Sequence, residues 1–167
     1  AAAAAAASLG QRSRVVGNVW DAYSIDIKTD NDGVGHGTHV AGTIGGNSIG
    51  VSRDASVLGV RVLNSDGSGE DIDIILGLDY ILTWYKNNNK PNTVVSMSLG
   101  GNCYSTEECE SDILVQATEI IVREGITVIV AAGNDDCDSC LQTPSYAPSA
   151  VTIGASTRDD LGAYFSD

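Results

Sequence analysis

Both histidines of this 167-residue chain lie in one glycine-rich stretch, GVGHGTHVAGTIGG, at residues 33–46. His36 and His39 are three residues apart, and Gly35 and Gly37 flank the first of them. Three roles are open for these side chains. A histidine near its ordinary pKa can accept and return a proton at neutral pH, so the uncrowded His36 is a candidate general base. The two could also share a metal ion, or either could be a structural core or capping group.

The spacing of the histidines favours a general base over a metal site. The zinc-protease pattern H-E-x-x-H needs its histidines at positions i and i+4 and a glutamate beside the first, whereas His36 and His39 are at i and i+3 with nothing acidic between them. We therefore interpret His36 as the base and His39 as a structural residue turned inward beside Val40. Such a base needs a nucleophile. The stretch GNSIG at 46–50 matches G-x-S-x-G, but Ser48 follows a helix and precedes no histidine, so it is not a nucleophile elbow.

Strand-like and helix-like segments alternate along the rest of the chain, which predicts an α/β fold with a mostly parallel sheet and helices on its faces. The predicted strands are 55–63, 93–100, 126–133 and 149–156, and the predicted helices are 36–44, 71–90 and 111–125. Gly125 is expected to end the last helix. Chemistry in such sheets gathers at the carboxyl ends of the strands, where this sequence has SLGG and AAGN.

The amino-terminal part of the sequence predicts less about the fold. Residues 1–7 are all alanine, and we interpret this tract as standing for residues without an assigned identity, so that it is left out of the fold prediction. Residues 8–35 are polar and irregular, and we expect residues 10–35 to be a surface insertion.

Charge and hydropathy exclude two classes of partner. The chain has 22 Asp plus Glu against 9 Lys plus Arg, a net charge of −13, which repels the phosphate backbone of nucleic acids. No apolar run is long enough to span a bilayer, so no membrane partner is expected.

Four cysteines allow three pairings. The short separations favour two local disulfides, Cys103 with Cys109 and Cys137 with Cys140, which would indicate an oxidising compartment. A four-thiolate zinc site, a C-x-x-C redox pair and free thiols are the alternatives, although only CDSC has the usual zinc spacing and its surroundings resemble a loop rather than the start of a helix.

The stretch GHGTHVAG resembles the histidine block of the subtilases, the subtilisin-like serine proteases. GVRVLNSDGSG, SMSLGG, VIVAAGND, YAPSAVTIGAS and FSD resemble further blocks of that family in the expected order. The resemblance covers residues 8–167 and implies part of a catalytic domain with the three-layer subtilisin-like fold. GTIGGNSIGVS and the NSDGSG loop are more similar to the proteinase K branch than to the bacillar enzymes.

The resemblance implies roles for particular residues. His36 would be the general base, and Asn134 would offer its side-chain amide to the oxyanion. The positions that resemble the substrate-binding elements are an edge that pairs with an extended peptide and the two walls of the S1 pocket. They are Ser68 and Gly69 for the edge, Ser98, Leu99 and Gly100 for one wall, and Ala131, Ala132 and Gly133 for the other.

The triad that the family uses is incomplete in this sequence. Its chain order is Asp, His, Ser, yet residues 8–35 contain no D-[ST]-G block, and Asp21, Asp26, Asp30 and Asp32 lie in the wrong context to replace it. No G-T-S-M-A block follows FSD. Two explanations remain: part of an active secreted endopeptidase, whose partners are a polypeptide substrate and the remainder of the catalytic domain, or a subtilase-derived scaffold that binds peptides without cleaving them.

The resemblance also implies a structural calcium ion. The carbonyl oxygens of Pro148 and Ala150 match the proteinase K-like site, whose aspartate would fall beyond residue 167. Oxygen ligands of this kind suit a hard cation. The cysteine positions do not match the common bridges of the family.

Overall fold

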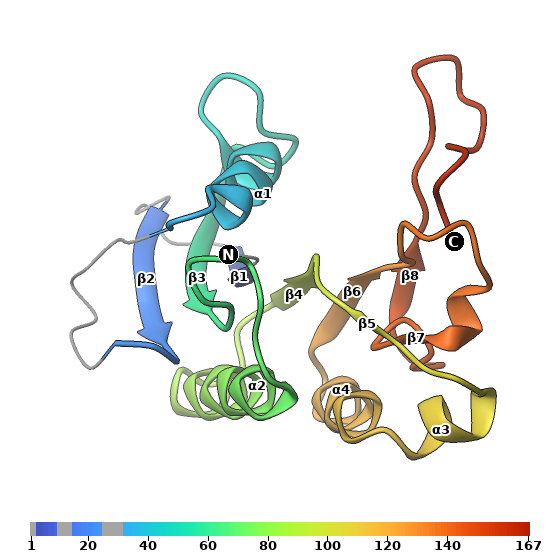
Figure 1. The fold of residues 1–167 in the computed structure, drawn as a ribbon. Helices are drawn as coiled ribbons and strands as arrows, with labels where there is room; N and C mark the ends of the chain where they lie inside the picture. The colour runs from blue at the N-terminus through green and yellow to red at the C-terminus, as the bar shows by residue number, and fades with distance from the viewer. Residues whose placement is uncertain (1–2, 10–14, 25–31) are drawn as a thin grey trace. The chain divides into compact units, whose positions relative to one another are not determined.

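The computed structural model describes residues 3–9, 15–24 and 32–167, which form two compact units (Figure 1). The first unit is Ala1–Ser98 and the second is Leu99–Asp167. Each unit contains strands, helices and a set of buried apolar side chains.

Four strands of the first unit lie side by side in the order β2-β3-β1-β4. They are β1 (Ala3–Leu9), β2 (Val15–Asp21), β3 (Ala55–Arg61) and β4 (Thr93–Met97). β2 and β3 are parallel, whereas β1 is antiparallel to both β3 and β4. The predicted strands β3 and β4 therefore run in the same direction. The expectation that residues 8–35 are irregular is wrong for β2 and for the last two residues of β1. The rest of β1 consists of residues 3–7 of the alanine tract, which was left out of the prediction.

Two helices pack on opposite sides of β3. α1 (His36–Gly45) lies against Val57, because a Cβ at Gly45 would be 2.9 Å from a methyl group of that valine. α2 (Asp71–Asn87) lies on the face of Val60 and Val62, which a Cβ at Gly77 would meet at 3.2 and 2.5 Å. Side chains alternate between the faces of a strand, so the odd and even valines assign the two helices to different faces, as Figure 1 shows.

Both sides of the first unit's sheet are covered, as the sequence predicts. The core comes from β3, β4 and the inner face of α2, and its fully or nearly fully buried members include Val60, Val62, Leu78, Ile81, Val95 and Met97. α2 ends at Asn87, before the predicted Lys90, because Asn89 and Lys90 have φ angles of 60° and 54° that a helix does not allow.

The second unit has a parallel pair of strands, β6 (Thr127–Ala131) and β8 (Val151–Ile153). A short antiparallel pair joins β5 (Gly101–Asn102) to β7 (Gln142–Thr143). The helix predicted over 111–125 is confirmed as α4 (Ile113–Arg123), with errors of two residues at its ends. A short helix that the sequence analysis did not predict, α3 (Thr106–Ser111), precedes it, and residue 112 divides the two.

Asp112 causes this division. Its backbone is extended (φ −64°, ψ 135°), and its carboxylate accepts hydrogen bonds from the N–H groups of Leu114 and Val115 at 2.8 and 3.2 Å. It thus caps α4, which a helix continuing through residue 112 would prevent. α4 ends before Gly125, whose φ of 99° confirms the predicted helix end.

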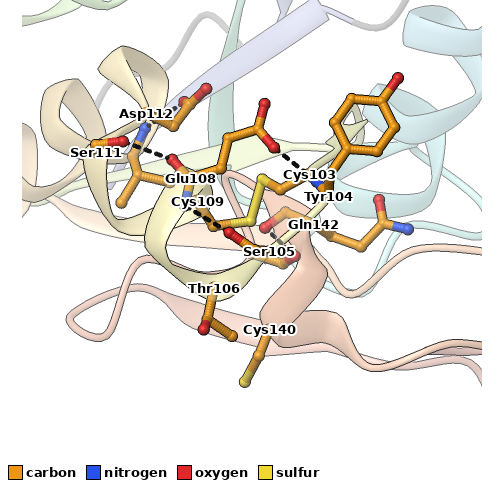
Figure 2. The surroundings of a disulfide bond; sticks show 12 residues. Cys103, Tyr104, Ser105, Thr106, Glu108, Cys109, Ser111, Asp112, Cys140 and Gln142 are labelled. Atoms are coloured by element: carbon orange, nitrogen blue, oxygen red, sulfur yellow. Dashed lines mark hydrogen bonds between the residues drawn. A yellow bond between two sulfur atoms is a disulfide. The ribbon is translucent and has the colours of Figure 1, made fainter.

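One of the two predicted disulfides is formed. Cys103 and Cys109 are bonded, with Cα atoms 5.6 Å apart, and the bridge ties β5 to α3 (Figure 2). Ser105 caps α3 by accepting from the N–H of Glu108 at 3.2 Å, while the Glu108 carboxylate accepts from the N–H of Tyr104 at 2.8 Å. This reciprocal arrangement resembles a capping box.

The predicted bridge between Cys137 and Cys140 is wrong: both thiols are free and exposed. Asp138 caps the 3₁₀ turn η1 (Ser139–Leu141) by accepting from the N–H of Cys140. The Cys140 side chain points away from the Cys103–Cys109 disulfide in Figure 2. The Cys137 sulfur accepts a hydrogen bond from the Gln142 amide at 3.4 Å. The two sulfurs are thus held in different surroundings. A four-thiolate zinc site is also excluded, because the formed disulfide uses two of the four sulfurs.

The strand and helix order, and the parallel direction of the predicted strands, confirm the α/β class. Among the described residues, no helix is both long and apolar enough to cross a membrane.

Candidate active site

His36 is the first residue of α1, and a carboxylate fixes the start of that helix. Asp32 accepts hydrogen bonds from the N–H of Gly35 at 3.0 Å and from both the N–H and the hydroxyl of Thr38 at 2.8 and 2.7 Å. Gly35 has a φ of 80°, which favours glycine, and the space where its Cβ would lie is open. The chain therefore turns sharply into the helix at His36.

Asp32 is ionised over the whole ordinary pH range. Partial burial acts to raise the pKa of Asp32, but the hydrogen bonds from the Thr38 hydroxyl and N–H and from Gly35 outweigh it and lower the pKa to about 2. Sequence analysis gave Asp32 no triad role, and it missed the hydrogen bonds by which Asp32 fixes the start of α1. The usual sequence signal is an Asp, Asn, Ser or Thr immediately before the helix; here that position is Gly35, and Asp32 lies three residues before it.

Both imidazoles are exposed in the first unit. His36 is free of bulky neighbours in the sequence, as predicted. His39 was expected to turn inward beside Val40, and this is wrong: it lies on the exposed side of α1, one turn further along. Its main chain is fully used within the helix, where its N–H donates to the carbonyl of Gly35 and its carbonyl accepts from the Thr43 hydroxyl.

We call residues 62–69, which follow β3 and carry Ser68 and Gly69, the 62–69 edge. Asn64 folds it into a turn: its N–H donates to the carbonyl of Ser68 at 2.7 Å, and its side-chain oxygen accepts from the N–H groups of Asp66 and Ser68 at 2.8 and 3.1 Å. Ser68 and Gly69 are exposed. A Cβ at Gly69 would lie 2.6 Å from the carbonyl oxygen of Val62, so only glycine fits there.

A buried ion pair lies next to the 62–69 edge and is hydrogen-bonded to it. The guanidinium of Arg61 lies 3.2 Å from the carboxylate of Asp21, and both side chains are buried, at 8% and 2% exposure. Arg61 also donates to the carbonyl of Leu63 at 3.1 Å. Its guanidinium stacks 5.5 Å from the ring of Tyr23, whose hydroxyl donates to Asp73 at 2.6 Å.

Sequence analysis assigned no role to Tyr23 or Arg61. Asp21 and Arg61 are 40 residues apart, so no local pattern links them.

The two proposed S1 walls follow β4 and β6. Ser98 ends the first unit, and Leu99 and Gly100 begin the second. Gly100 packs closely there, because a Cβ at this position would be 2.8 Å from the carbonyl oxygen of Thr143. On the second wall, Ala131 and Gly133 are half-buried and Ala132 is buried. The N–H of Ala132 donates to the carbonyl of Ile153 at 2.9 Å, which continues the β6–β8 pairing.

Asn134 is exposed at the carboxyl end of β6, directly after Gly133, whose φ is 130°. This is the position at which sheets of this class hold catalytic groups. His36 belongs to the first unit and Asn134 to the second. Their placement on one cleft stays a prediction.

The two carbonyls proposed for calcium, those of Pro148 and Ala150, belong to the turn that precedes β8. Glu119 fixes this turn, since its carboxylate accepts from both the N–H and the hydroxyl of Ser149 at 2.8 Å. Main-chain oxygens suit Ca²⁺, which takes six to eight oxygen ligands, so these two could supply only part of a coordination shell. Among the described residues, no three His, Cys, Asp or Glu side chains form a metal-binding group.

Comparison with known proteins identifies the chain. It matches the subtilase family over residues 6–167 and belongs to that family. It is 43% identical to a cuticle-degrading serine protease of Arthrobotrys oligospora, over 89% of this chain and 34% of the relative. It is 43% identical to an extracellular serine proteinase of a Thermus species, over 80% of this chain and 30% of the relative.

Among solved structures, a cold adapted subtilisin-like serine proteinase has a TM-score of 0.77 and 36% identity, over 96% of this chain and 56% of that one. This likeness confirms the predicted subtilisin-like fold. The chain spans about a third of the length of the relatives that it matches.

Proposed function

We propose that the full-length protein carrying this chain is a serine endopeptidase in which His36 is the general base and Asn134 stabilises the oxyanion. The observation that carries the proposal is the GHGTHVAG block at the start of α1, in a chain of the subtilase family. The Asp32 cap supports it, because it fixes the backbone from which His36 projects. The exposure of Asn134 at the end of β6 supports the second role.

In the proposed mechanism, a serine hydroxyl from outside residues 1–167 attacks the peptide carbonyl. The imidazole of His36 removes the hydroxyl proton during the attack and later donates it to the leaving amine. The carbonyl oxygen becomes negatively charged in the tetrahedral intermediate. The Asn134 amide donates a hydrogen bond to that oxygen, and a donor already in place costs no reorganisation when the charge forms.

The substrate is proposed to be an extended polypeptide. Its backbone would pair with Ser68 and Gly69 of the 62–69 edge, as an added strand does. Its side chain next to the cleaved bond would lie between the walls formed by residues 98–100 and 131–133. Apart from Leu99, these walls consist of Ser, Ala and Gly, which have little side-chain bulk, so they leave room for a large apolar group.

Two further properties belong to this proposal. The carbonyls of Pro148 and Ala150 would contribute ligands to a structural calcium ion, and removal of calcium by excess chelator should then lower the melting temperature. Secretion is supported by the Cys103–Cys109 disulfide, which is stable in oxidising compartments, and by a relative named as extracellular.

A fluorophosphonate probe tests the reaction class. The full-length protein should be labelled on one serine, and His36→Ala should abolish the labelling and lower kcat by about 10⁶-fold, a loss measured in another member of this family. His39→Ala is the matched control, since it removes an exposed imidazole from the same helix. This variant should keep kcat within about tenfold of the wild type, because the hydrogen bonds of His39 to other described residues use its main chain.

An unlabelled wild-type protein would contradict the proposal. If that protein still bound peptides without cleaving them, the subtilase-derived scaffold would be the correct function.

A further inference from the structure

The turn that follows Asn134 wraps around a carboxylate from a distant segment. The N–H groups of Asp135 and Cys137 both donate to one oxygen of Asp167, at 2.9 and 2.8 Å. Between them, the N–H of Asp136 donates to the carbonyl of Phe165 at 3.1 Å. Three consecutive backbone N–H groups after Asn134 therefore point at residues 165–167.

This turn has the geometry of an anion-binding nest. Asp136 has a φ of 53°, in the left-handed region that an aspartate adopts at a cost. A left-handed residue in such a turn brings successive N–H groups toward a common point, and the resulting concavity favours an anion. The Asp167 carboxylate is the anion present.

The same carboxylate also restrains the residue before Asn134. Gly133 has a φ of 130°, and a Cβ there would collide with a carboxylate oxygen of Asp167. That second oxygen accepts from the Gln142 side-chain amide at 2.9 Å, and Gln142 is buried. Asp167 thus contacts the backbone on both sides of Asn134, at Gly133 and at Asp135.

We infer that Asp167 is a positioning residue for the oxyanion donor: it holds the backbone on either side of Asn134 so that the side-chain amide is aimed before substrate arrives. This inference rests on the proposed function. Because Asp167 occupies the N–H groups of residues 135 and 137, those donors are unavailable to substrate. The Asn134 side chain is exposed, and its amide is the donor that we expect the substrate to meet there.

The inference predicts a loss in kcat with little change in KM. Asp167→Ala removes the acceptor for both N–H groups and leaves Asn134 free to sample other directions. Misplacement of a catalytic group by about 1 Å can cost on the order of 10²-fold. We expect kcat to fall by about 10- to 100-fold on a peptide p-nitroanilide that the wild type cleaves, and KM to change by less than about threefold.

Asp167→Asn should retain most of the activity. Asparagine keeps one side-chain oxygen that can accept from Asp135 and Cys137, so kcat should stay within about fivefold of the wild type. Asp159→Ala is the matched control: it removes an exposed carboxylate from the same carboxyl-terminal segment and should leave kcat and KM unchanged. If the alanine variant fails to fold, Asp167→Ser, whose shorter side chain cannot reach both amides, takes its place.

A double-mutant cycle with Asn134→Ala separates positioning from general stability. Loss of an oxyanion donor costs about 10²–10³-fold in kcat, a magnitude measured in this same family. If Asp167 acts through Asn134, Asp167→Ala should cost less than about threefold once Asn134 is already absent. An equal loss in both backgrounds would overturn the inference, as would a loss in Asp167→Asn as large as in Asp167→Ala.

The same cycle distinguishes this inference from the proposed function. If Asn134→Ala alone leaves kcat unchanged, the oxyanion role itself is wrong and the inference falls with it. If Asn134→Ala has the expected effect and the two variants are merely additive, only the positioning role of Asp167 is wrong.

Discussion

The 62–69 edge and the loop at residues 131–137 each follow a strand and carry proposed substrate-binding or catalytic residues, yet they are held in different ways. Next to the 62–69 edge, the buried cation Arg61 is paired with the buried anion Asp21. In the 131–137 loop, the anion Asp167 is held by backbone N–H groups at the surface. The described residues include no lysine or arginine within ion-pair distance of Asp167.

This difference predicts that substitutions in the two regions affect stability and loop geometry differently. Removing one member of a buried ion pair leaves an uncompensated charge, which costs folding free energy. Removing Asp167 exposes N–H groups that water can reach, because Asp135 and Cys137 are exposed. We therefore expect changes around Arg61 to lower mainly stability, and changes around Asp167 to alter mainly the geometry of the loop.

The largest expected effect is that of Arg61→Met. It leaves Asp21 buried without its partner and should lower the free energy of unfolding by about 3–5 kcal/mol. Urea denaturation in a His36→Ala background, which prevents self-cleavage, would measure it. Arg53→Met is the control, because Arg53 is exposed and its hydrogen bonds to described residues go to the carbonyls of Ser48 and Gly50 in its own turn. This variant should lower the free energy of unfolding by less than about 1 kcal/mol. Equal losses would remove the proposed contrast between the two regions.

Gly133→Ala should have the next largest effect. Its φ of 130° strains any other residue, and the new Cβ would meet the Asp167 carboxylate, at a cost of about 1–3 kcal/mol. The displaced loop should also lower kcat by more than tenfold. Gly162→Ala, in open space in the same unit, should change neither quantity. A fully active Gly133→Ala enzyme would show that the 131–137 loop tolerates displacement.

Acid should loosen the 131–137 loop. The N–H of Cys137, followed by that of Asp135, holds the pKa of Asp167 below its ordinary value of 3.8. A lowered pKa contributes stability that is present above pH 3.8 and is lost as the pH falls further. The amide-proton chemical shifts of residues 135 and 137 should therefore move together below about pH 4, and Asp167→Asn should abolish that movement. Unchanged shifts would show that the carboxylate does not hold the turn.

Alkali should loosen the 62–69 edge, with the smallest effect. Burial, followed by the hydrogen bond to Asp73, raises the pKa of Tyr23 to about 12. A raised pKa contributes stability that is present below pH 10.0 and is lost as the pH rises toward 12. Because Tyr23 is 41% exposed, we expect its ionisation to lower the free energy of unfolding by less than about 1 kcal/mol. Phenolate absorbance should show one late-titrating tyrosine that is missing in Tyr23→Phe.

Local signals were sufficient for most elements of the fold. The apolar spacing of 71–90 and the β-branched run at 55–63 predicted α2 and β3 with errors only at their ends, because periodicity reports which face of an element is buried. Gly125 marked the end of α4, and the pattern from residue 36 to residue 44 predicted α1. These features depend on residues within a few positions of one another.

Tertiary structure decided the rest. The pairing of β1 and of β2 with β3, and the contacts of Arg61 and Asp167, depend on partners 30 to 58 residues away in the sequence. The two free thiols of CDSC depend on the path of a turn. A charged side chain has the same sequence signature whether it lies in water, in a buried pair or in a nest of N–H groups. Its role is fixed only when the fold brings its partner within hydrogen-bonding distance, since the energy of these contacts falls steeply as that distance grows.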